Sequence, residues 1–456
     1  MKMDPVIFRE YDIRGVYDKD YDLTFAEKLG RALVTYCAKE RGVENPCFTI
    51  GMDARLSSPG IVDAVSKGIR SSGGSVKKLG LVTSPMTYFT TFEVPGVDAG
   101  VMITGSHNPP EYNGFKISIG TSTIFGEEIQ KLKKFINDED FLTGDGVEET
   151  IDISEQYVNR YKEEFGNLGG HKVVLDCGNG AGGCIARRLY DAVGLETEVL
   201  YEEPDGNFPN HHPDPTVEEN LVDLKAAVKK HGAVAGIGFD GDADRIGLVD
   251  ETGRTIWGDE IIALCARFIL EKSPGEKIIG DVKCSDRLYD YVSKYGGKPI
   301  MWKTGHSLVK QKIKDESSPF GGELSGHIFF ADRNYGYDDA LYAGLRVIEV
   351  IAKTGKKIGE LLEDFPPAFN TPELRIDTTE EKKVSIVEKL VEKFGKDTKD
   401  RKANLIDGIR VSYPDGWALA RASNTQPVLV LRFESSTEEG LKRIRNEFES
   451  VVEPLL

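Results

Sequence analysis

Three stretches of the chain repeat one pattern of hydrophobic and polar positions. Each begins with an apolar run of strand length, passes through a polar or glycine-bearing turn into an amphipathic segment of helical period, and returns to a second apolar run. The stretches span residues 48–82, 172–201 and 277–302. Strand–helix–strand units at this spacing are typical of α/β domains whose strands pair mostly in parallel. Their recurrence predicts three related α/β domains.

The C-terminal part of the chain follows a different pattern. A helical period over 385–394 precedes two apolar runs, 416–420 and 427–433, which flank a polar loop. A second helical segment covers 439–451. We therefore expect a smaller α+β domain at this end of the chain.

Three interruptions of the pattern suggest domain boundaries. They are an acidic, glycine-containing stretch over 137–152, a turn over 250–254 that ends a strand, and the consecutive prolines Pro366 and Pro367. The predicted domains are 1–150, 151–253, 254–367 and 368–456.

Composition and charge narrow the class of protein. The chain has 456 residues, of which 39% are hydrophobic and 29% are charged, as in globular proteins of several domains. The net charge of −17 argues against a surface for nucleic acid or anionic membrane. No signal-peptide core or membrane-spanning run is recognisable, and the six cysteines form no CxxC pair. These features predict a cytoplasmic enzyme with reduced thiols.

A serine loop follows the apolar run 99–103. In Thr104-Gly-Ser-His-Asn-Pro-Pro, Ser106 stands beside a glycine at a strand exit, where a hydroxyl is well placed as a nucleophile. The alternative is a polar turn whose side chains satisfy backbone groups. Lys116, shortly afterwards, could stabilise the charge of a phosphate or relay a proton, although a single lysine is more often a solvated surface group.

An aspartate loop follows a second apolar strand. Asp240, Asp242 and Asp244 alternate in Asp240-Gly-Asp-Ala-Asp-Arg, so their carboxylates can converge on a hard cation. A solvated acidic turn is the competing interpretation. Repulsion among three clustered carboxylates favours a cation, and magnesium suits a site that also contacts phosphate.

Two further loops carry weaker evidence. Gly321-Gly-Glu-Leu-Ser-Gly-His would place Glu323 and Ser325 on one side of an extended segment, suitable for sugar hydroxyls, with His327 as a proton carrier. In Arg421-Ala-Ser-Asn-Thr-Gln-Pro, a guanidinium, hydroxyls and an amide can all donate to phosphate. An ordinary polar connection would have the same composition. Neither a P-loop nor a complete dinucleotide fingerprint is recognisable, which disfavours a nucleotide-dependent enzyme.

Taken together, these loops resemble the α-D-phosphohexomutase family over essentially the whole chain. The motifs, in the family's order, are Phe8-Arg-Glu-Tyr-Asp-Ile-Arg-Gly, Thr104-Gly-Ser-His-Asn-Pro, Asp240-Gly-Asp-Ala-Asp-Arg, Gly322-Glu-Leu-Ser-Gly-His and Arg421-Ala-Ser-Asn-Thr-Gln-Pro. Within the family, the chain is most similar to the phosphomannomutase/phosphoglucomutase branch. The resemblance implies four domains around a central cleft, three of them with a related mixed α/β topology.

The resemblance also implies roles for individual residues. Ser106 would be the phosphoserine and, with Asp240, Asp242 and Asp244, would bind magnesium. Charged positions near the reacting centre would be Lys116, Arg245, His306 and His327. Glu323 and Ser325 would bind the sugar. The loop that binds the substrate phosphate would contain Arg421, Ser423, Asn424 and Thr425. Further substrate-binding positions would be Tyr11, Arg14 and Lys283.

The implied activity is the interconversion of hexose 1-phosphate and hexose 6-phosphate, with mannose or glucose as the sugar and hexose 1,6-bisphosphate as intermediate and activator. A phosphoglucosamine mutase is the nearest alternative, although Leu324 stands where those enzymes typically have glutamine. A catalytically silent sugar-phosphate binding or regulatory protein is an alternative of another class, and a metal-dependent phosphatase is a third.

Overall fold

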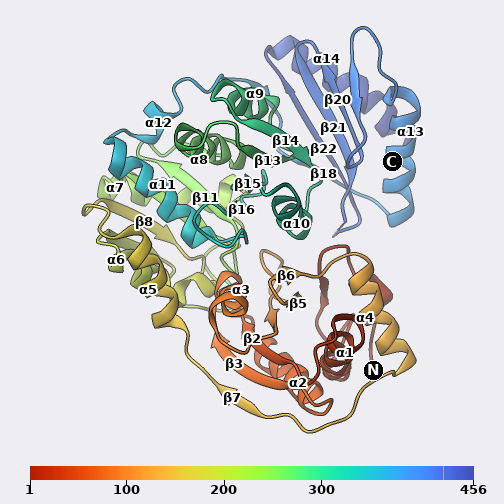
Figure 1. Ribbon diagram of the computed structural model, residues 1–456. Coiled ribbons are helices and arrows are strands. Elements are labelled where there is room, and N and C mark those ends of the chain that lie inside the picture. Colours follow the sequence, from red (N-terminus) through yellow and green to blue (C-terminus); the bar gives the residue numbers. More distant parts are fainter. Residues whose placement is uncertain (425) are drawn as a thin grey trace. The chain divides into compact units, whose positions relative to one another are not determined.

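A computed structural model describes residues 1–424 and 426–456 (Figure 1). By its internal contacts the chain divides into two compact units. The first comprises Met1–Ile261 and Ser325–Leu361, and the second comprises Ile262–Leu324 and Leu362–Leu456. The four predicted domain boundaries stay predictions, since a division into two units does not test them.

The N-terminal sheet of the first unit has the strand order β1-β5-β4-β2-β3-β7, with β6 beside β5. Its strands are β1 (Ile13–Val16), β2 (Cys47–Met52), β3 (Ser75–Leu81), β4 (Ala99–Ile103), β5 (Tyr112–Ile119), β6 (Ser122–Thr123) and β7 (Glu148–Thr150). Its helices are α1 (Leu23–Arg41), α2 (Ser58–Arg70), α3 (Ser84–Glu93) and α4 (Glu127–Asp138). β2 pairs in parallel with β3 and β4, which confirms the first strand–helix–strand unit. β5 runs antiparallel to β1 and β4, so the sheet is mixed.

Successive side chains of β2 point to opposite faces of this sheet, and helices cover both faces. Phe48 and Ile50 are fully buried in the hydrophobic core that includes α1 and α2. Thr49 points to the other face, where its hydroxyl lies 2.6 Å from that of Thr90 on α3. A strand covered on both faces carries few charged residues, as the sequence of β2 shows.

The second sheet of this unit has the order β12-β11-β10-β8-β9. Its strands are β8 (Lys172–Asp176), β9 (Glu196–Leu200), β10 (Ala235–Phe239), β11 (Ile246–Asp250) and β12 (Thr255–Ile256). Also in this unit are β16 (Ile328–Phe330), α5 (Ser154–Phe165), α6 (Ala186–Ala192), α7 (Val222–His231), α11 (Ala340–Thr354) and α12 (Ile358–Leu361). β8 pairs in parallel with β9 and β10, which confirms the second predicted unit.

The second unit contains the third repeat. Its elements are β13 (Lys277–Asp281), α9 (Asp286–Lys294), β14 (Lys298–Trp302), α10 (His306–Glu316) and β15 (Phe320–Gly322). α8 (Gly258–Lys272) begins in the first unit and continues in the second. β13 pairs in parallel with both β14 and β15, as the sequence pattern predicts.

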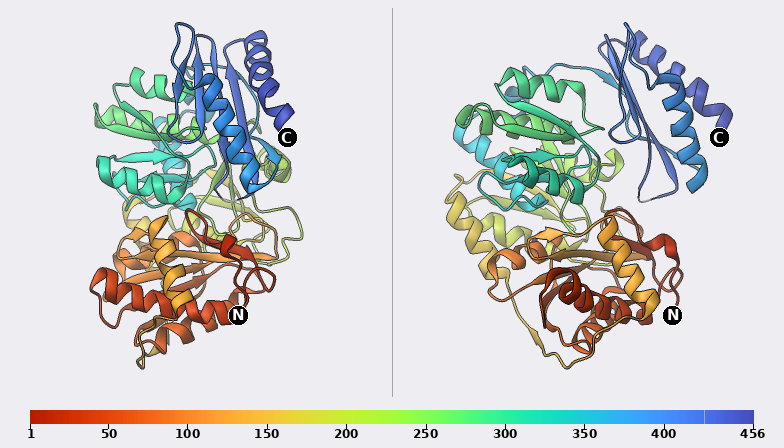
Figure 2. Two further views of the ribbon diagram at one scale, coloured as in Figure 1. Left: turned by 90° about the vertical axis from the view of Figure 1, so that its right-hand side faces the viewer. Right: turned by 45° about the vertical axis from the view of Figure 1, so that its right-hand side comes forward.

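The C-terminal sheet has the order β17-β22-β21-β20-β19, with β18 also paired to β22. Its strands are β17 (Phe369–Asn370), β18 (Leu374–Asp377), β19 (Lys402–Asn404), β20 (Ile409–Tyr413), β21 (Gly416–Ala422) and β22 (Val428–Ser435). α13 (Glu380–Phe394) and α14 (Glu438–Val452) cover one face of it (Figure 2). Phe394 of α13 stacks on Phe448 of α14 within that core, with ring centroids 4.7 Å apart. Two helices on one face of an antiparallel sheet form the predicted α+β domain.

The opposite face of the C-terminal sheet packs on the turn that follows β13. The Arg410 guanidinium lies 3.6 Å from the ring centroid of Trp417 and donates to the Cys284 carbonyl at 2.9 Å. Its second terminal nitrogen contacts Asp286 Oδ1 at 2.7 Å. Trp417 Nε1 donates to Glu434 Oε1 at 3.1 Å. Since Arg410 is buried, its guanidinium finds these hydrogen-bond partners only when both the C-terminal sheet and the turn after β13 are present.

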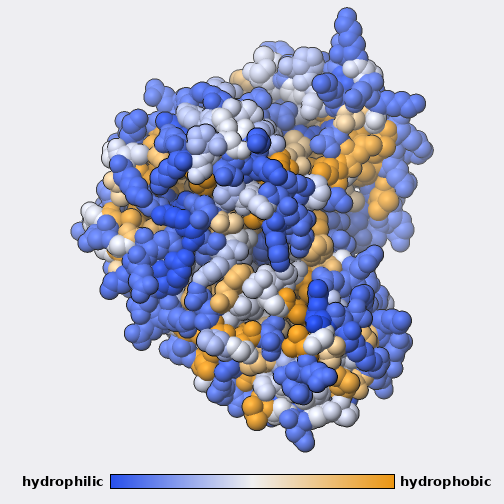
Figure 3. Space-filling view, viewed as in Figure 1, coloured by the Kyte–Doolittle hydropathy of each residue, from blue (hydrophilic) through white to orange (hydrophobic). Residues whose placement is uncertain are grey.

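The polarity of the surface agrees with the charged composition of the chain. Hydrophilic side chains cover most of the face displayed in Figure 3, in keeping with the net charge of −17. Over the described residues, 1–424 and 426–456, we find no helix that combines the length and apolarity needed to cross a membrane.

Candidate active site

Ser106 lies in the loop after β4, at the carboxyl end of a central strand. Its backbone is left-handed, with φ of 50°, and its N–H donates to Thr104 Oγ1 at 2.8 Å. The side chain is buried, and its hydroxyl donates to Asp240 Oδ2 at 2.7 Å. The predicted nucleophile and the first predicted metal ligand are therefore direct neighbours.

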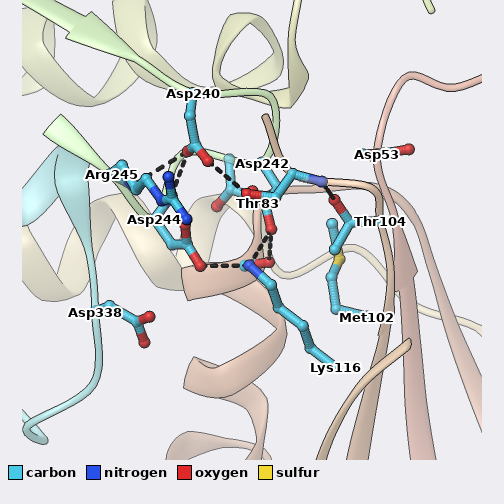
Figure 4. A network of polar contacts seen from close by, with 12 residues as sticks. Asp53, Thr83, Met102, Thr104, Lys116, Asp240, Asp242, Asp244, Arg245 and Asp338 are labelled. Atoms are coloured by element: carbon cyan, nitrogen blue, oxygen red, sulfur yellow. Dashed lines mark hydrogen bonds and ion pairs between the residues drawn. The ribbon is translucent and has the colours of Figure 1, made fainter. Parts of the chain in front are cut away.

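The aspartate loop follows β10 and turns back into β11. Asp240 Oδ1 accepts the backbone N–H groups of Asp244 and Arg245, both at 3.1 Å, which fixes the turn. Asp240, Asp242 and Asp244 each offer a carboxylate oxygen, and these oxygens lie within 4.8 Å of one another (Figure 4). All three residues are fully buried. This arrangement matches the oxygen-rich ligand set of a hard divalent cation.

A glycine allows the two loops to approach. A Cβ atom at Gly241 would overlap the carbonyl oxygen of Ser106. Only a residue without a side chain can therefore occupy this position between Asp240 and Asp242.

Lys116, on β5, points into the same cluster. Its ammonium contacts Asp242 Oδ2 at 2.5 Å and also contacts Asp244. Burial alone would lower the pKa of Lys116, but Asp242 and Asp244 outweigh it and hold the pKa above its ordinary value. The sequence left a solvated surface lysine open as an alternative, and its burial rules that out.

The carboxylates themselves favour bound positive charge. Burial, followed by the charges of Asp242 and Asp244, raises the pKa of Asp240 well above its ordinary value. Asp242 Oδ1 is buried and has no hydrogen-bond partner among the described residues. Ser84, at the start of α3, donates from its hydroxyl to the other oxygen, Oδ2, at 2.5 Å. A cation among these carboxylates would relieve both the repulsion and the unsatisfied oxygen.

Arg245 and His327 lie next to the aspartates. Arg245 Nε donates to His327 Nε2 at 3.3 Å, so the ring's Nδ1 would carry the hydrogen that faces Ser325 Oγ at 3.2 Å. His327 Nε2 is also 3.4 Å from Asp244 Oδ1 and 3.9 Å from Asp338 Oδ2. Asp244, His327 and Asp338 form a second group whose ligand atoms lie within 4.8 Å.

The segment Leu324–Gly326 forms a turn and is not extended as the sequence analysis assumed. Gly326 has φ of 86°, and a Cβ atom there would overlap the Ile246 carbonyl oxygen. Because Glu323 and Ser325 are joined by this turn, the alternation expected of an extended segment does not describe their side chains.

Tyr11 and Arg14 belong to the first unit. Tyr11 is buried just before β1, and Arg14 lies on β1 with its guanidinium 2.5 Å from Asp12 Oδ2. His107, which the sequence analysis assigned no role, has its Nδ1 atom 3.3 Å from Ser106 Oγ. Burial, followed by the charges of Arg245 and Arg14, lowers the pKa of His107 well below its ordinary value.

The second unit brings three other predicted residues together around Asp281. Lys283 Nζ lies 3.1 Å from Glu373 Oε2 and 4.0 Å from Asp281 Oδ2. Asp281 Oδ1 accepts the Leu324 N–H at 3.2 Å, which holds the residue after Glu323. Glu323 Oε1 in turn accepts the Gly305 N–H at 2.5 Å, directly before His306 at the start of α10. Asp281 is therefore an organising residue that the sequence analysis missed.

The predicted phosphate loop lies at the end of β21. Arg421 Nε donates to Asp407 Oδ2 at 2.9 Å, and the same oxygen accepts the Thr304 N–H at 3.1 Å. Ser423 is buried, and its Oγ accepts the Gln426 N–H at 3.3 Å. Asn424 follows in the same loop. Thr425 lies outside the described residues.

Contacts within the first unit thus link one group of predicted residues: Ser106, Lys116, the three aspartates, Arg245, Ser325 and His327. In the other unit, Asp281 and Asp407 contact the segments that contain Lys283, His306, Glu323, Arg421 and Ser423.

Four family models match successive parts of the chain. They describe phosphoglucomutase/phosphomannomutase alpha/beta/alpha domain I over residues 5–143, domain II over 155–253, domain III over 257–369 and the C-terminal domain over 373–451. These matches confirm the predicted four-domain α/β fold class.

Individual proteins match over nearly their full length. A phosphomannomutase/phosphoglucomutase of Pseudomonas aeruginosa is 44% identical and covers 97% of this chain and 94% of that protein. A phosphoglucomutase of Neisseria gonorrhoeae is 42% identical over 98% of this chain and 96% of that protein. The crystal structure of a phosphoglucomutase/phosphomannomutase family protein from Burkholderia thailandensis has a TM-score of 0.91 at 42% identity, covering 99% of this chain and 98% of that one. With its motifs, its serine and aspartate loops and its four matched domains in agreement, the chain belongs to the phosphoglucomutase/phosphomannomutase family.

Proposed function

We propose that this chain is a phosphohexomutase that interconverts hexose 1-phosphate and hexose 6-phosphate through phosphorylated Ser106 and a hexose 1,6-bisphosphate. The observation that carries the proposal is the buried Ser106 hydroxyl, 2.7 Å from Asp240 Oδ2 in a cluster of three aspartates. Phosphoryl transfer needs an aligned nucleophile and compensation of spreading negative charge, and this arrangement supplies both. The proposed substrates are the monophosphates of mannose and glucose.

Magnesium is the proposed metal, held by Asp240, Asp242, Asp244 and the oxygen on Ser106. The unpartnered Oδ1 atom of Asp242 and the all-oxygen donor set fit a hard cation. When bound, the metal would act as a Lewis acid on the transferring phosphoryl group.

The chain's own residues would carry out the transfer in two balanced halves. In the first, the P–O bond to Ser106 breaks, a P–O bond to the free sugar hydroxyl forms, and that hydroxyl's proton passes to a base. The released Ser106 oxygen takes up a proton in exchange. In the second, the P–O bond between the other phosphate and its sugar oxygen breaks, a P–O bond to Ser106 forms, and the serine proton passes through a base to the leaving sugar oxygen. Lys116 and Arg245 would stabilise the phosphoryl charge, and His306 and His327 are the proposed proton carriers. Burial of Ser106 would limit hydrolysis by water.

Further predicted residues would bind the rest of the substrate. Arg421, Ser423, Asn424 and Thr425 are proposed to bind the phosphate that does not react. Glu323 and Ser325 would bind the sugar hydroxyls. Tyr11, Arg14 and Lys283 would complete the substrate contacts. The phosphate loop must accept either end of the sugar, because the bisphosphate presents each phosphate to Ser106 in turn.

A coupled mutase assay tests the function. With Mg²⁺ and trace hexose 1,6-bisphosphate, we expect turnover of both glucose 1-phosphate and mannose 1-phosphate, and loss of turnover when EDTA removes the metal. Released inorganic phosphate, measured in parallel, should stay far below the isomerised product, whereas an excess would indicate a phosphatase. Turnover of glucosamine 1-phosphate alone would identify the amino-sugar mutase. Binding of hexose phosphate without turnover of any of the three sugars would contradict the mutase proposal.

Arg421→Ala should weaken substrate binding more than catalysis. Loss of charge-assisted hydrogen bonds to phosphate, worth about 1.5–3 kcal/mol, corresponds to a KM increase of roughly 10- to 100-fold. The control is Arg443→Ala, which removes an exposed arginine that pairs with Asp415 in the same unit. Steady-state kinetics on glucose 1-phosphate give both constants, and an unchanged KM for Arg421→Ala would refute its role.

A further inference from the structure

A buried ion pair lies beneath the Ser106 loop and contacts its backbone. Asp53 and Arg55 follow β2, and their side chains are almost completely buried. Arg55 Nε donates to Asp53 Oδ2 at 3.0 Å. Neither residue belongs to a motif that the sequence analysis singled out.

The Arg55 guanidinium uses all of its hydrogen-bonding capacity. A guanidinium has five N–H donors. Besides Asp53, its acceptors are the backbone carbonyls of Ser106 at 2.8 Å, Asn108 at 2.6 Å, Tyr112 at 3.0 Å and Pro109. One side chain therefore binds three carbonyl groups of the loop that carries the nucleophile and the carbonyl of the first residue of β5.

Asp53 binds both the arginine and the loop. Its Oδ2 atom accepts the Gly105 N–H at 3.1 Å in addition to Arg55 Nε. Its Oδ1 atom accepts the Arg55 N–H at 3.0 Å and the Ser58 hydroxyl at 2.8 Å. The carboxylate thus sets the orientation of Arg55 and also holds the residue that precedes Ser106.

Arg55 packs closely against the loop and against a neighbouring ring. A Cβ atom at Gly105 would overlap the Arg55 guanidinium. Phe208, from the loop after β9, lies with its ring centroid 5.2 Å from Arg55 Cζ. Ser106 itself holds a left-handed backbone that residues with side chains seldom adopt, so surrounding contacts must stabilise it.

We propose that Arg55, oriented by Asp53, is a positioning residue that fixes the backbone of the Ser106 loop so that the serine oxygen faces the aspartate cluster during phosphoryl transfer. The inference rests on the proposed function, since it assigns Arg55 a part in that chemistry without contact with the substrate. Its effect should therefore fall on the rate of transfer to and from Ser106 and only weakly on substrate affinity.

Arg55→Met tests the inference, because methionine fills similar space without donors. A displaced nucleophile should lower kcat, and the rate of Ser106 phosphorylation by glucose 1,6-bisphosphate, by about 10²-fold, with KM within about threefold. Quenched-flow samples analysed by intact mass give the phosphorylation rate. Arg55→Lys should regain part of it, since an ammonium retains three donors.

The matched control is Arg346→Met, which removes another buried arginine of the same unit, one that pairs with Asp332 through two hydrogen bonds of 2.7 and 2.8 Å. All variants are compared below their melting temperatures. Arg346→Met should retain kcat within about twofold, because it lowers stability without touching the Ser106 loop. An equal loss of phosphorylation in this control, or a folded Arg55→Met variant with a near-normal phosphorylation rate, would overturn the proposal.

If Arg55→Met does not fold, the Asp53→Asn variant tests the proposed positioning role instead. It keeps the shape of the side chain and removes its charge, and the phosphorylation rate should fall about tenfold. A rate equal to that of the wild type would overturn the proposal. The wild-type enzyme distinguishes the proposed function from the proposed role of Arg55. If the wild type showed neither Ser106 phosphorylation nor turnover, the proposed function would be refuted. If the wild type and the Arg55 variant were equally active, only the role of Arg55 would be refuted.

Discussion

Ser106→Ala is expected to lower kcat by at least about 10³-fold, as removal of a covalent nucleophile should. Alanine keeps the Cβ atom and removes only the hydroxyl that donates to Asp240. Coupled kinetics on glucose 1-phosphate measure the loss, and intact mass after incubation with glucose 1,6-bisphosphate should show no phosphorylated protein.

Ser66→Ala is the control for this variant. It also removes a buried serine hydroxyl from the first unit. Ser66 lies on α2, and its hydroxyl donates to Glu148. Its kcat should stay within about twofold of the wild type, because a single lost hydrogen bond affects stability more than chemistry. If Ser106→Ala retained a near-normal rate, Ser106 could not be the phosphorylated residue.

Asp242→Asn is expected to weaken magnesium binding and to lower kcat/KM by about 10³-fold at a fixed low concentration of Mg²⁺. Asparagine fits the same space but lacks the charge, and its amide nitrogen cannot bind a cation. One oxygen of Asp242 already accepts Ser84 and Lys116, whereas the other has no hydrogen-bond partner among the described residues. The substitution therefore removes the charge of one proposed ligand, while Lys116 keeps Asp244 as a partner.

Isothermal titration with Mg²⁺, together with activity as a function of its concentration, measures this effect. Asp250→Asn provides the matched control, since Asp250 is equally buried at the opposite end of β11, and its Oδ1 atom closes a turn by accepting the Thr252 and Arg254 N–H groups at 2.9 Å. The control should bind Mg²⁺ normally. Equal metal affinity in Asp242→Asn and the wild type would remove Asp242 from the ligand set.

Sequence periodicity predicted the repeated strand–helix–strand units because that pattern is local. The first strand of each unit, at Phe48, Val173 and Ile278, is an apolar run whose length and flanking turns suffice to identify it. The C-terminal helices were predicted nearly as well, although α13 begins five residues earlier than expected, at Glu380. Thr379, which accepts the Lys382 N–H at 3.2 Å, is an N-cap that could have placed this start.

The neighbourhood of the serine and aspartate loops was accessible only through family resemblance. Ser106 and Asp240 are 134 residues apart, and neither loop alone indicates its partner. Their contact depends on the approach of loops that follow strands of two different sheets and on the missing side chain at Gly241. Such a long-range approach leaves no periodic pattern in the sequence.

The supporting residues were missed for a related reason. Asp53, Arg55, Asp281 and Asp407 each bind at least one backbone N–H or carbonyl group that is distant in sequence. Every residue except proline offers both groups, so the composition of the partner segment carries no information about the contact. Sequence reasoning identifies side chains that do chemistry more readily than those that hold loops in place.

The junction between Arg410, Trp417 and the turn after β13 affects how this protein can be divided into recombinant fragments. A fragment of residues 368–456 would contain the whole C-terminal sheet, yet it would expose the Trp417 face and leave Arg410 without the Cys284 carbonyl and Asp286. A fragment that also retains residues 262–324 would keep these partners. For isotope labelling, library screening or crystallisation of separate parts, the sheet and the turn that it covers should therefore be produced together.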